Sequence, residues 1–450
     1  MKKHTQSPYE SSKVSYKPSG IEWLGEIPQH WEVVKGDFVF SNKKELNSNL
    51  QCQERLALTL NGVIEKDINQ NDGLNPMDFS TYQIFEKNDL VFKLIDLDNV
   101  NTSRVGYVYK KGIMSSAYIR LIIGKKSYAK FFYYYYFSLY INQVFNNLGT
   151  GVRATLNPDE LLAIKIPLPP LQEQKEIAEF LDKKCEKIQN YINKKQKLIT
   201  LLQEKKQALI NEVVTKGLNP NIESKNSGIE YLRLIPHHWE VVRSGLIYKN
   251  ISSGTTPQSD NDEYYKNGNI FWINSGDLND SVLTNSKNKI TQKAMMAHSA
   301  LKISPKGSLI IAMYGATIGK VSILGIDACT NQACCVLCES KYLNTRFVFY
   351  YFVAKRQDLI SMAYGGGQPN ISQDIIKNFK IPLPPLQEQE EIAAFLDSKV
   401  AQIDSAIEKT KKQIELVKEY KNTLINEAVC GRVACSRDFS PTAQNDKKKN

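Results

Sequence analysis

The 450-residue sequence lacks the motifs that mark most enzymes. It contains only five histidines, and none has the spacing of a metal site. No nucleophile elbow of the form G-x-S-x-G occurs, and the segment GATIGK, which ends at Lys320, is one residue short of a phosphate-binding P-loop. There is also no glycine-rich fingerprint for S-adenosylmethionine and no Asn-Pro-Pro-aromatic tetrapeptide. We therefore expect no catalytic residue, no metal ligand and no cofactor bound by this chain.

Long apolar runs are missing as well. No stretch approaches about eighteen apolar residues, and no apolar segment follows the basic residues at the start, so we expect neither a membrane span nor a signal peptide. Eight cysteines without a secretory signal favour a reducing cytoplasm over a disulfide framework. Four of them lie between Cys329 and Cys338, where ACCVLC is interpreted as a buried strand rather than a zinc site.

The chain has instead an excess of positive charge, with a formal net charge of +11 and a pI of about 9.0. A solvated lysine surface and a polyanionic partner both explain such an excess. Glycine and proline are not enriched, and 42% of the residues are hydrophobic, so most of the chain should fold. The length suits two or three domains.

An internal repeat spans nearly the whole sequence. SGIEWLGEIPQHWEVV begins at Ser19 and SGIEYLRLIPHHWEVV at Ser227, while the nine residues IPLPPLQEQ begin at both Ile166 and Ile381. The interiors of the two copies, 41–125 and 249–340, show little resemblance. Shared frames with different interiors indicate one task performed on two targets, although drift after duplication would leave the same pattern.

A long helix is predicted after each IPLPP. The two prolines suit the first helical positions, and Glu173 and Glu388 each lie in a first turn, where the helix dipole favours an acidic residue. Gly217 and Gly431 follow the last periodic turns and are interpreted as C-caps. Apolar residues recur every three, four or seven positions, as in a coiled coil. The predicted seam contains Ile177, Leu181, Ile188, Leu202, Leu209, Ile392, Leu396, Ile403, Ile407, Val417 and Leu424, with Leu198 on the same face.

The chain order of domain, helix, domain, helix favours an antiparallel pairing of the two helices, because a parallel one would require longer connections. The first helix would span roughly 55 Å from Ile177 to Val213. An antiparallel pair gives the chain a pseudo-two-fold axis, so the two globular halves, and any target that each of them reads, would be inverted with respect to each other.

Each globular half is predicted to be a mixed α+β domain. Trp31 and Trp239 are interpreted as core anchors, because tryptophan is so often buried. In the second half, strands are expected at 269–273, 307–313 and 321–323, joined by polar loops. The strands in the interior of the first half are harder to predict from the sequence.

Loop residues that can hydrogen-bond to base edges and phosphates are the candidate DNA contacts. Arg and Lys suit guanine, whereas Gln and Asn suit adenine, so Arg153 in one glycine loop and Gln368 in the other would fit two different half-sites. The candidates are Lys93, Arg104, Thr150, Arg153, Thr255, Thr256, Ser275, Asp277, Tyr314, Thr317, Lys320, Asn331, Gln332, Gln368 and Asn370.

These motifs resemble the specificity subunits of type I restriction-modification systems. The resemblance rests on the doubled SGIE–HWEVV and IPLPPLQEQ segments, with EIAEFLD and EIAAFLD behind the latter, and on SGTTP, GATIGK and TNQ in the second half. It implies two target-recognition domains on an antiparallel coiled coil. The implied segments are an N-terminal extension at 1–18, domains at 19–165 and 227–380, long helices at 166–217 and 381–431, a linker at 218–226 and a basic tail at 432–450.

The resemblance also implies the partners. Each domain would read one half of a split, asymmetric site on double-stranded DNA, and the helices would space the halves. Two modification subunits with S-adenosylmethionine would methylate adenine, and two restriction subunits with ATP and Mg would translocate and cleave DNA. A methylation-only or fused type II-like system is an alternative, and a coiled-coil adaptor that binds no DNA is another.

Overall fold

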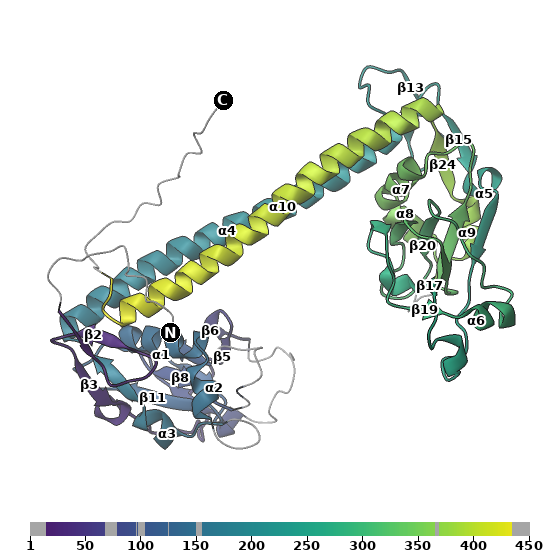
Figure 1. Ribbon diagram of the computed structural model, residues 1–450. Helices are drawn as coiled ribbons and strands as arrows, with labels where there is room; N and C mark the ends of the chain where they lie inside the picture. The colour runs from purple at the N-terminus through teal and green to yellow at the C-terminus, as the bar shows by residue number, and fades with distance from the viewer. Residues whose placement is uncertain are drawn as a thin grey trace. The chain divides into compact units, whose positions relative to one another are not determined.

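The computed structural model divides into two compact units (Figure 1). Unit 1 holds the residues up to Lys194 together with those from Lys412 onward, and unit 2 holds Lys195–Lys411. Each unit therefore contains a globular domain, the first part of the helix that follows it and the last part of the other long helix. The structure describes residues 15–67, 79–95, 97, 104–124, 126–149, 155–364 and 369–433.

Both halves combine short strands with helices, as the prediction of an α+β fold requires, and in the first half a run of strands precedes the helices. In chain order, the first half contains β1 (Tyr16–Pro18), β2 (Glu26–Pro28), β3 (Glu32–Lys35), β4 (Phe40–Ser41), β5 (Leu56–Thr59), β6 (Gly62–Glu65), β7 (Gln83–Phe85), β8 (Leu90–Phe92), β9 (Val105–Tyr107), β10 (Gly112–Met114), β11 (Ile119–Ile123), α1 (Ala129–Ile141), α2 (Val144–Leu148), α3 (Pro158–Ala163), β12 (Lys165–Leu168) and α4 (Leu171–Lys216). The second half contains β13 (Ser224–Asn226), β14 (Leu234–Pro236), β15 (Glu240–Arg243), α5 (Ser244–Ile247), β16 (Asn250–Ser253), β17 (Ile270–Ile273), β18 (Val282–Leu283), β19 (Lys289–Ile290), α6 (Gln292–Ala297), β20 (Leu309–Ala312), β21 (Val321–Leu324), β22 (Ala328–Thr330), β23 (Cys334–Cys338), α7 (Thr345–Ala354), α8 (Arg356–Ser361), α9 (Gln373–Asn378), β24 (Lys380–Leu383) and α10 (Leu386–Val429).

The dissimilar interiors each contain a sheet of the same topology. Its strand order is β4-β11-β8-β9 in domain 1 and β16-β23-β20-β21 in domain 2, where β18 adds a fifth strand beside β21. The shared pairs are all antiparallel. The central register is also the same, because Arg120 faces Val91 as Val336 faces Ile310. The fold of the interior has thus been kept while its sequence has changed.

A two-stranded ribbon closes each domain where it meets the long helix. β3 pairs with β12, and β15 pairs with β24, both antiparallel, so the HWEVV and IPLPP segments lie side by side. Because 165–168 form β12, helix α4 begins only at Leu171. The two motifs that identify the repeat are therefore one structural element, which joins the domain to its helix.

The tryptophans are core anchors, as predicted. Trp31 is 1% exposed and Trp239 is fully buried. Their Nε1 atoms donate to Glu173 Oε2 at 2.9 Å and to Glu388 Oε2 at 3.0 Å. The histidine before each tryptophan lies 2.7 or 2.8 Å from the same carboxylate. The first helical turn is therefore fixed to the domain by the same hydrogen bonds in both copies.

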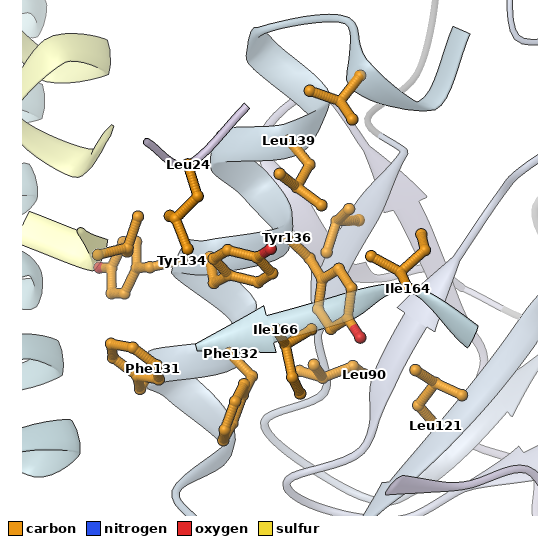
Figure 2. Packing of buried hydrophobic residues seen from close by; sticks show 14 of the residues in the cluster. Leu24, Leu90, Leu121, Phe131, Phe132, Tyr134, Tyr136, Leu139, Ile164 and Ile166 are labelled. Carbon is orange, nitrogen blue, oxygen red and sulfur yellow. The ribbon is translucent and has the colours of Figure 1, made fainter. Parts of the chain in front are cut away.

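The aromatic helix α1 supplies much of the core of domain 1 (Figure 2). Phe131, Phe132 and Tyr136 are completely buried and pack with Leu90 of β8 and Ile166 of β12. In domain 2, α7 contributes the corresponding aromatic residues to a similar core. Helix α1 thus connects the sheet to the ribbon that carries the long helix.

The two long helices pair antiparallel in both units. In unit 1, residues 177–181 of α4 share a core with 425–429 of α10, near the end of that helix. In unit 2, residues 210–214 near the end of α4 share a core with 392–396 near the start of α10. Lys206 Nζ and Asp404 Oδ1, 2.7 Å apart, bridge the helices there. This is the antiparallel pairing that the chain order predicts.

The seam residues differ in their burial. Ile177, Leu181, Ile188, Ile392, Leu396 and Ile407 are buried, whereas Leu202, Leu209, Ile403, Val417 and Leu424 are half-buried. Leu198, placed on the same face by the sequence pattern, is 39% exposed, and Ile199 is buried instead. An α-helix drifts against a seven-residue repeat, which shifts the buried face by one residue here.

Both predicted C-caps have the left-handed backbone that favours glycine. The φ angle is +75° at Gly217 and +72° at Gly431. A Cβ atom on Gly217 would lie 3.3 Å from Trp239 Cζ2, and one on Gly431 would lie 2.9 Å from Trp31 Cζ2. The end of each long helix therefore packs against the tryptophan of the domain in its own unit.

Candidate nucleic-acid interface

The loops predicted to read DNA meet at one edge of domain 2. Strands β17 and β22 run parallel, with Ile273 facing Thr330, so the segments that follow them emerge together. Asn331 N donates to Ile273 O at 3.0 Å. Ser275 and Asp277 belong to the first of these segments, a short 3-10 turn, and Asn331 and Gln332 to the second. Four of the candidate residues are thereby neighbours.

The SGTTP loop lies on the TNQ loop. Thr256 Oγ1 donates to Gln332 Oε1 at 2.6 Å, and Gly254 N donates to Thr330 Oγ1 at 3.2 Å. A Cβ atom on Gly254 would lie only 1.7 Å from Thr330 O, so only glycine permits this close approach. Trp272 Nε1 donates to Thr255 O at 3.2 Å, which fixes the SGTTP loop to strand β17. The two loops are thus held as one polar surface.

The GATIGK segment is the hairpin between β20 and β21. Ala312 N donates to Lys320 O at 2.9 Å, and Gly319 N donates to Ala312 O at 2.8 Å. Its base is tied to the TNQ loop, because Met313 N donates to Ala333 O at 2.8 Å. Tyr314, Thr317 and Lys320 are half-buried, so each retains some exposed surface beside that loop.

The segment before α9 completes the edge. Ile371 N donates to Met313 O at 2.8 Å, which places Asn370 beside the base of the hairpin. Asn370 pairs with Tyr364 through two backbone hydrogen bonds of 2.9 and 3.2 Å. Tyr364 is 73% exposed, and it is not among the candidates predicted from the sequence. Tyr364 could have been predicted as a DNA contact because it is an aromatic residue next to the glycine loop, and bases stack on exposed rings.

Arg356 supports the hairpin through hydrogen bonds, and it too was not predicted from the sequence. Its Nε donates to Gly319 O at 3.0 Å, and its Nη2 lies 2.5 Å from Asp280 Oδ1. Asp280 Oδ1 also accepts from Val321 N at 3.1 Å. The side chain of Arg356 is 24% exposed and therefore partly shielded from solvent. It acts as a positioning residue for the hairpin.

Domain 1 has the same backbone pairing at the corresponding strand ends, those of β8 and β9. Lys93 N donates to Arg104 O at 3.0 Å, as Ala312 N donates to Lys320 O, and Leu156 N donates to Leu94 O at 2.9 Å. Arg104 is only 2% exposed, and its Nη1 donates to Ile95 O at 3.1 Å. This placement gives Arg104 a structural role in this pairing, whereas Lys93 is half-buried. The candidates Thr150, Arg153 and Gln368 lie outside the described residues.

The cysteine-rich segment of domain 2 is the buried strand that the sequence predicts. All residues of β23 are buried, and Cys329 is buried in β22, the strand that precedes it in the chain. Burial raises the pKa of the Cys329 thiol to about 11 and that of Cys335 to about 12. Protonated thiols are poor metal ligands. Among the described residues, no group of three or more His, Cys, Asp or Glu side chains is placed to hold a metal ion.

The side chains at this edge of domain 2 are suited to hydrogen bonding rather than to catalysis. Thr, Asn, Gln, Tyr and Lys side chains can read base edges or hold phosphates. Asp277 has a local role, because its Oδ2 accepts from Asn274 N at 2.9 Å and caps the turn. Within the described residues, none of the helices combines the length and the apolar character that crossing a bilayer requires.

Several known proteins are similar to this chain in sequence, and several solved structures are similar to it in fold. The "MjaVIII specificity subunit" of a type I restriction enzyme from Methanocaldococcus jannaschii is 27% identical, over 90% of this chain and 94% of its own. The EcoBI specificity subunit of Escherichia coli is 24% identical, over 71% and 69%. Both relatives thus align with this chain well beyond a single domain.

Two solved structures have a similar fold. A chain described under "Structural basis underlying complex assembly and conformational transition of the type I R-M system" aligns with a TM-score of 0.71 and 17% identity, over 90% of this chain and 99% of its own. The HsdS subunit from Thermoanaerobacter tengcongensis aligns with a TM-score of 0.52 and 18% identity, over 90% and 98%. Residues 29–203 and 236–416 each match the family described as "Type I restriction modification DNA specificity domain", and the chain belongs to that family with two copies of the domain.

Proposed function

We propose that this chain is the DNA-recognition subunit of a type I restriction-modification complex and that each domain reads one half of a bipartite, asymmetric site. The observation that carries the proposal is the convergence of the SGTTP, TNQ and GATIGK loops at one edge of domain 2. These loops belong to the interior that differs between the copies. Because the interior alone varies, the two half-sites would have different sequences.

The long helices would set the distance between the half-sites. Helix α4 has 46 residues, which corresponds to about 69 Å of helix. One heptad inserted into both α4 and α10 adds about 10 Å to each, or roughly three base pairs. We expect the preferred spacer to lengthen accordingly, and methylome sequencing of cells that express the variant measures it. An unchanged spacer would refute the role of the helices as a ruler.

Catalysis would belong to the partners. We propose that two modification subunits with S-adenosylmethionine methylate adenine in the site and that two restriction subunits with ATP and Mg translocate and cleave the DNA. The chain itself would contribute no catalytic residue. The complex would act on cellular DNA in the cytoplasm, and the seven cysteines that the structure describes, all of them free thiols, fit a reducing compartment.

Deletion of the gene tests the proposal as a whole. Loss of one split, adenine-methylated motif from the host methylome is the expected result, and restoration by a plasmid copy is the control. A methylome without any lost motif would contradict DNA recognition. It would leave the coiled-coil adaptor as the remaining function.

The individual base contacts can be tested in domain 2. Gln332→Ala should weaken binding to the cognate duplex by about tenfold, with little effect on a duplex in which that half-site is scrambled. Gln258→Ala, at an exposed position of the neighbouring loop, is a matched control. An equal loss on both duplexes would assign Gln332 to phosphate contact or loop structure instead.

A further inference from the structure

An exposed apolar side chain recurs at one position of both domains. EVVKGDF at Glu32 aligns with EVVRSGL at Glu240, so Phe38 corresponds to Leu246. Phe38 is 71% exposed and Leu246 is 76% exposed. A single exposed apolar residue is ordinary on a protein surface. Retention at the same position of two copies is not expected from chance exposure.

Three residues before this position, each copy has a cation that faces a second cation across the two-stranded ribbon. Lys35 of β3 faces Lys165 of β12, and Arg243 of β15 faces Lys380 of β24. Like charges directly opposite each other in an antiparallel pair repel. None of the four side chains forms an ion pair with a carboxylate among the described residues. An unfavourable arrangement that recurs twice points to an acidic partner outside the domain.

We call these residues the repeated patch: Lys35, Phe38 and Lys165 in unit 1, and Arg243, Leu246 and Lys380 in unit 2. In domain 2 the repeated patch lies away from the candidate DNA interface. Strand β16 runs from Asn250, beside Cys338, to Ser253, beside Cys335, and the SGTTP loop follows the Ser253 end. Leu246 precedes the opposite end of the strand.

The surroundings favour a protein over DNA as the occupant. The repeated patch belongs to the frame that the two copies share, whereas a half-site reader must differ between them. Phosphates would match the cations but would gain nothing from an exposed Phe or Leu. A protein segment with an apolar side chain flanked by carboxylates satisfies both features, in the usual arrangement of an apolar anchor with a polar rim.

We propose that the repeated patch docks an acidic segment of the modification subunit, with an apolar side chain of that segment against Phe38 in unit 1 and Leu246 in unit 2. One modification subunit would thus occupy each unit. The inference rests on the proposed function, because it takes the modification subunit as the partner. It adds the surface of each globular domain that the partner contacts.

The test uses the full chain co-purified with its modification subunit, with native mass spectrometry to count subunits. Wild-type chain should retain two modification subunits. Phe38→Ser and Leu246→Ser should each reduce the number to one, and the double variant should bind about tenfold or more weakly at both sites. Lys35→Glu with Lys165→Glu should have the effect of Phe38→Ser.

Matched controls separate docking from folding. Leu60→Ser in domain 1 and Met296→Ser in domain 2 remove side chains that are 61% and 78% exposed outside the repeated patch, and both variants should retain two subunits. Thermal melting should be the same for all of these variants, because the changed side chains lie on the surface.

The outcomes also distinguish the two proposals. If the double variant retains two modification subunits, the docking inference is wrong and the proposed function stands. If the double variant retains both subunits but loses affinity for cognate DNA, the repeated patch is a DNA contact. If the wild-type chain neither retains the modification subunit nor directs methylation, the proposed function itself fails.

Discussion

The frames of the two domains agree in their contacts, and the interiors agree only in their topology. In both frames a tryptophan donates to the first acidic residue of the long helix. Inside, domain 1 buries an ion pair between Arg120 and Asp89, whereas domain 2 has Val336 and Ser308 at the corresponding positions of its sheet. The comparison teaches that attachment to the helices depends on particular side chains, while the sheet accepts different ones.

Removal of the frame tryptophans should have the largest effect. Trp31→Ala and Trp239→Ala each leave a cavity and remove one of the two hydrogen bonds to the helix carboxylate, and each should destabilise its own unit by about 3–5 kcal/mol. Chemical denaturation with domain-resolved hydrogen exchange measures both. Equal losses would support equivalent frames, and a difference of several kcal/mol would break the comparison.

The buried ion pair of domain 1 should respond differently to single and double changes. The Arg120 and Asp89 side chains are both 4% exposed, with Nε 2.6 Å from Oδ2. Asp89→Ala leaves the arginine buried without this partner and should destabilise domain 1 by about 3–5 kcal/mol.

The double variant Asp89→Ser with Arg120→Val installs the residues of domain 2. It should recover most of the lost stability, because replacing both partners of a buried pair is often nearly neutral. Urea unfolding measures the free energy for wild type and both variants. If the double variant is as unstable as the single one, the two interiors are not interchangeable.

Arg356→Ala should act on recognition more than on stability. Without the bond to Gly319 O, the GATIGK hairpin loses its support, and affinity for the cognate half-site should fall by about tenfold. Arg356→Lys keeps a charge for Asp280 and should recover part of the affinity. Fluorescence anisotropy with cognate and half-scrambled duplexes provides the measurement, and equal losses on both would contradict a positioning role.

The smallest effect is expected for Thr256→Val. It removes the 2.6 Å hydrogen bond to Gln332 on an exposed surface, so the stability of domain 2 should change by about 1 kcal/mol or less. Binding to the cognate half-site should weaken only a few-fold. A loss larger than that of Arg356→Ala would mean that Thr256 touches DNA directly.

The sequence predicted the frame well, because each of its signals occurs twice in nearly the same letters. The two Trp anchors, the antiparallel helices and both glycine caps follow from local pattern and chain order. The interior of domain 1 was harder to predict, since its strands are only two to five residues long, too short for an alternating pattern to identify them.

The site was predicted only in part, for a physical reason. Residues that lie in a polar loop can be selected from sequence, as Thr256 and Gln332 were. Arg356 acts through Asp280, 76 residues away, and no local pattern encodes such a contact. Arg104 shows that burial is also hard to infer, because an arginine in a polar stretch need not face solvent, and this one is 2% exposed.

The packing of domain 1 against the end of α10 has a consequence for biosynthesis. The core of domain 1 includes Ile425, Val429 and Cys430, and Tyr16 Oη donates to Gly431 O at 3.1 Å. Unit 2, in contrast, is complete once Lys411 has been synthesised. The first domain to leave the ribosome is therefore the last to be finished. Until the end of α10 has been synthesised, the core of domain 1 is incomplete. The exposed apolar surface of domain 1 is then the part of the nascent chain most in need of protection by a chaperone.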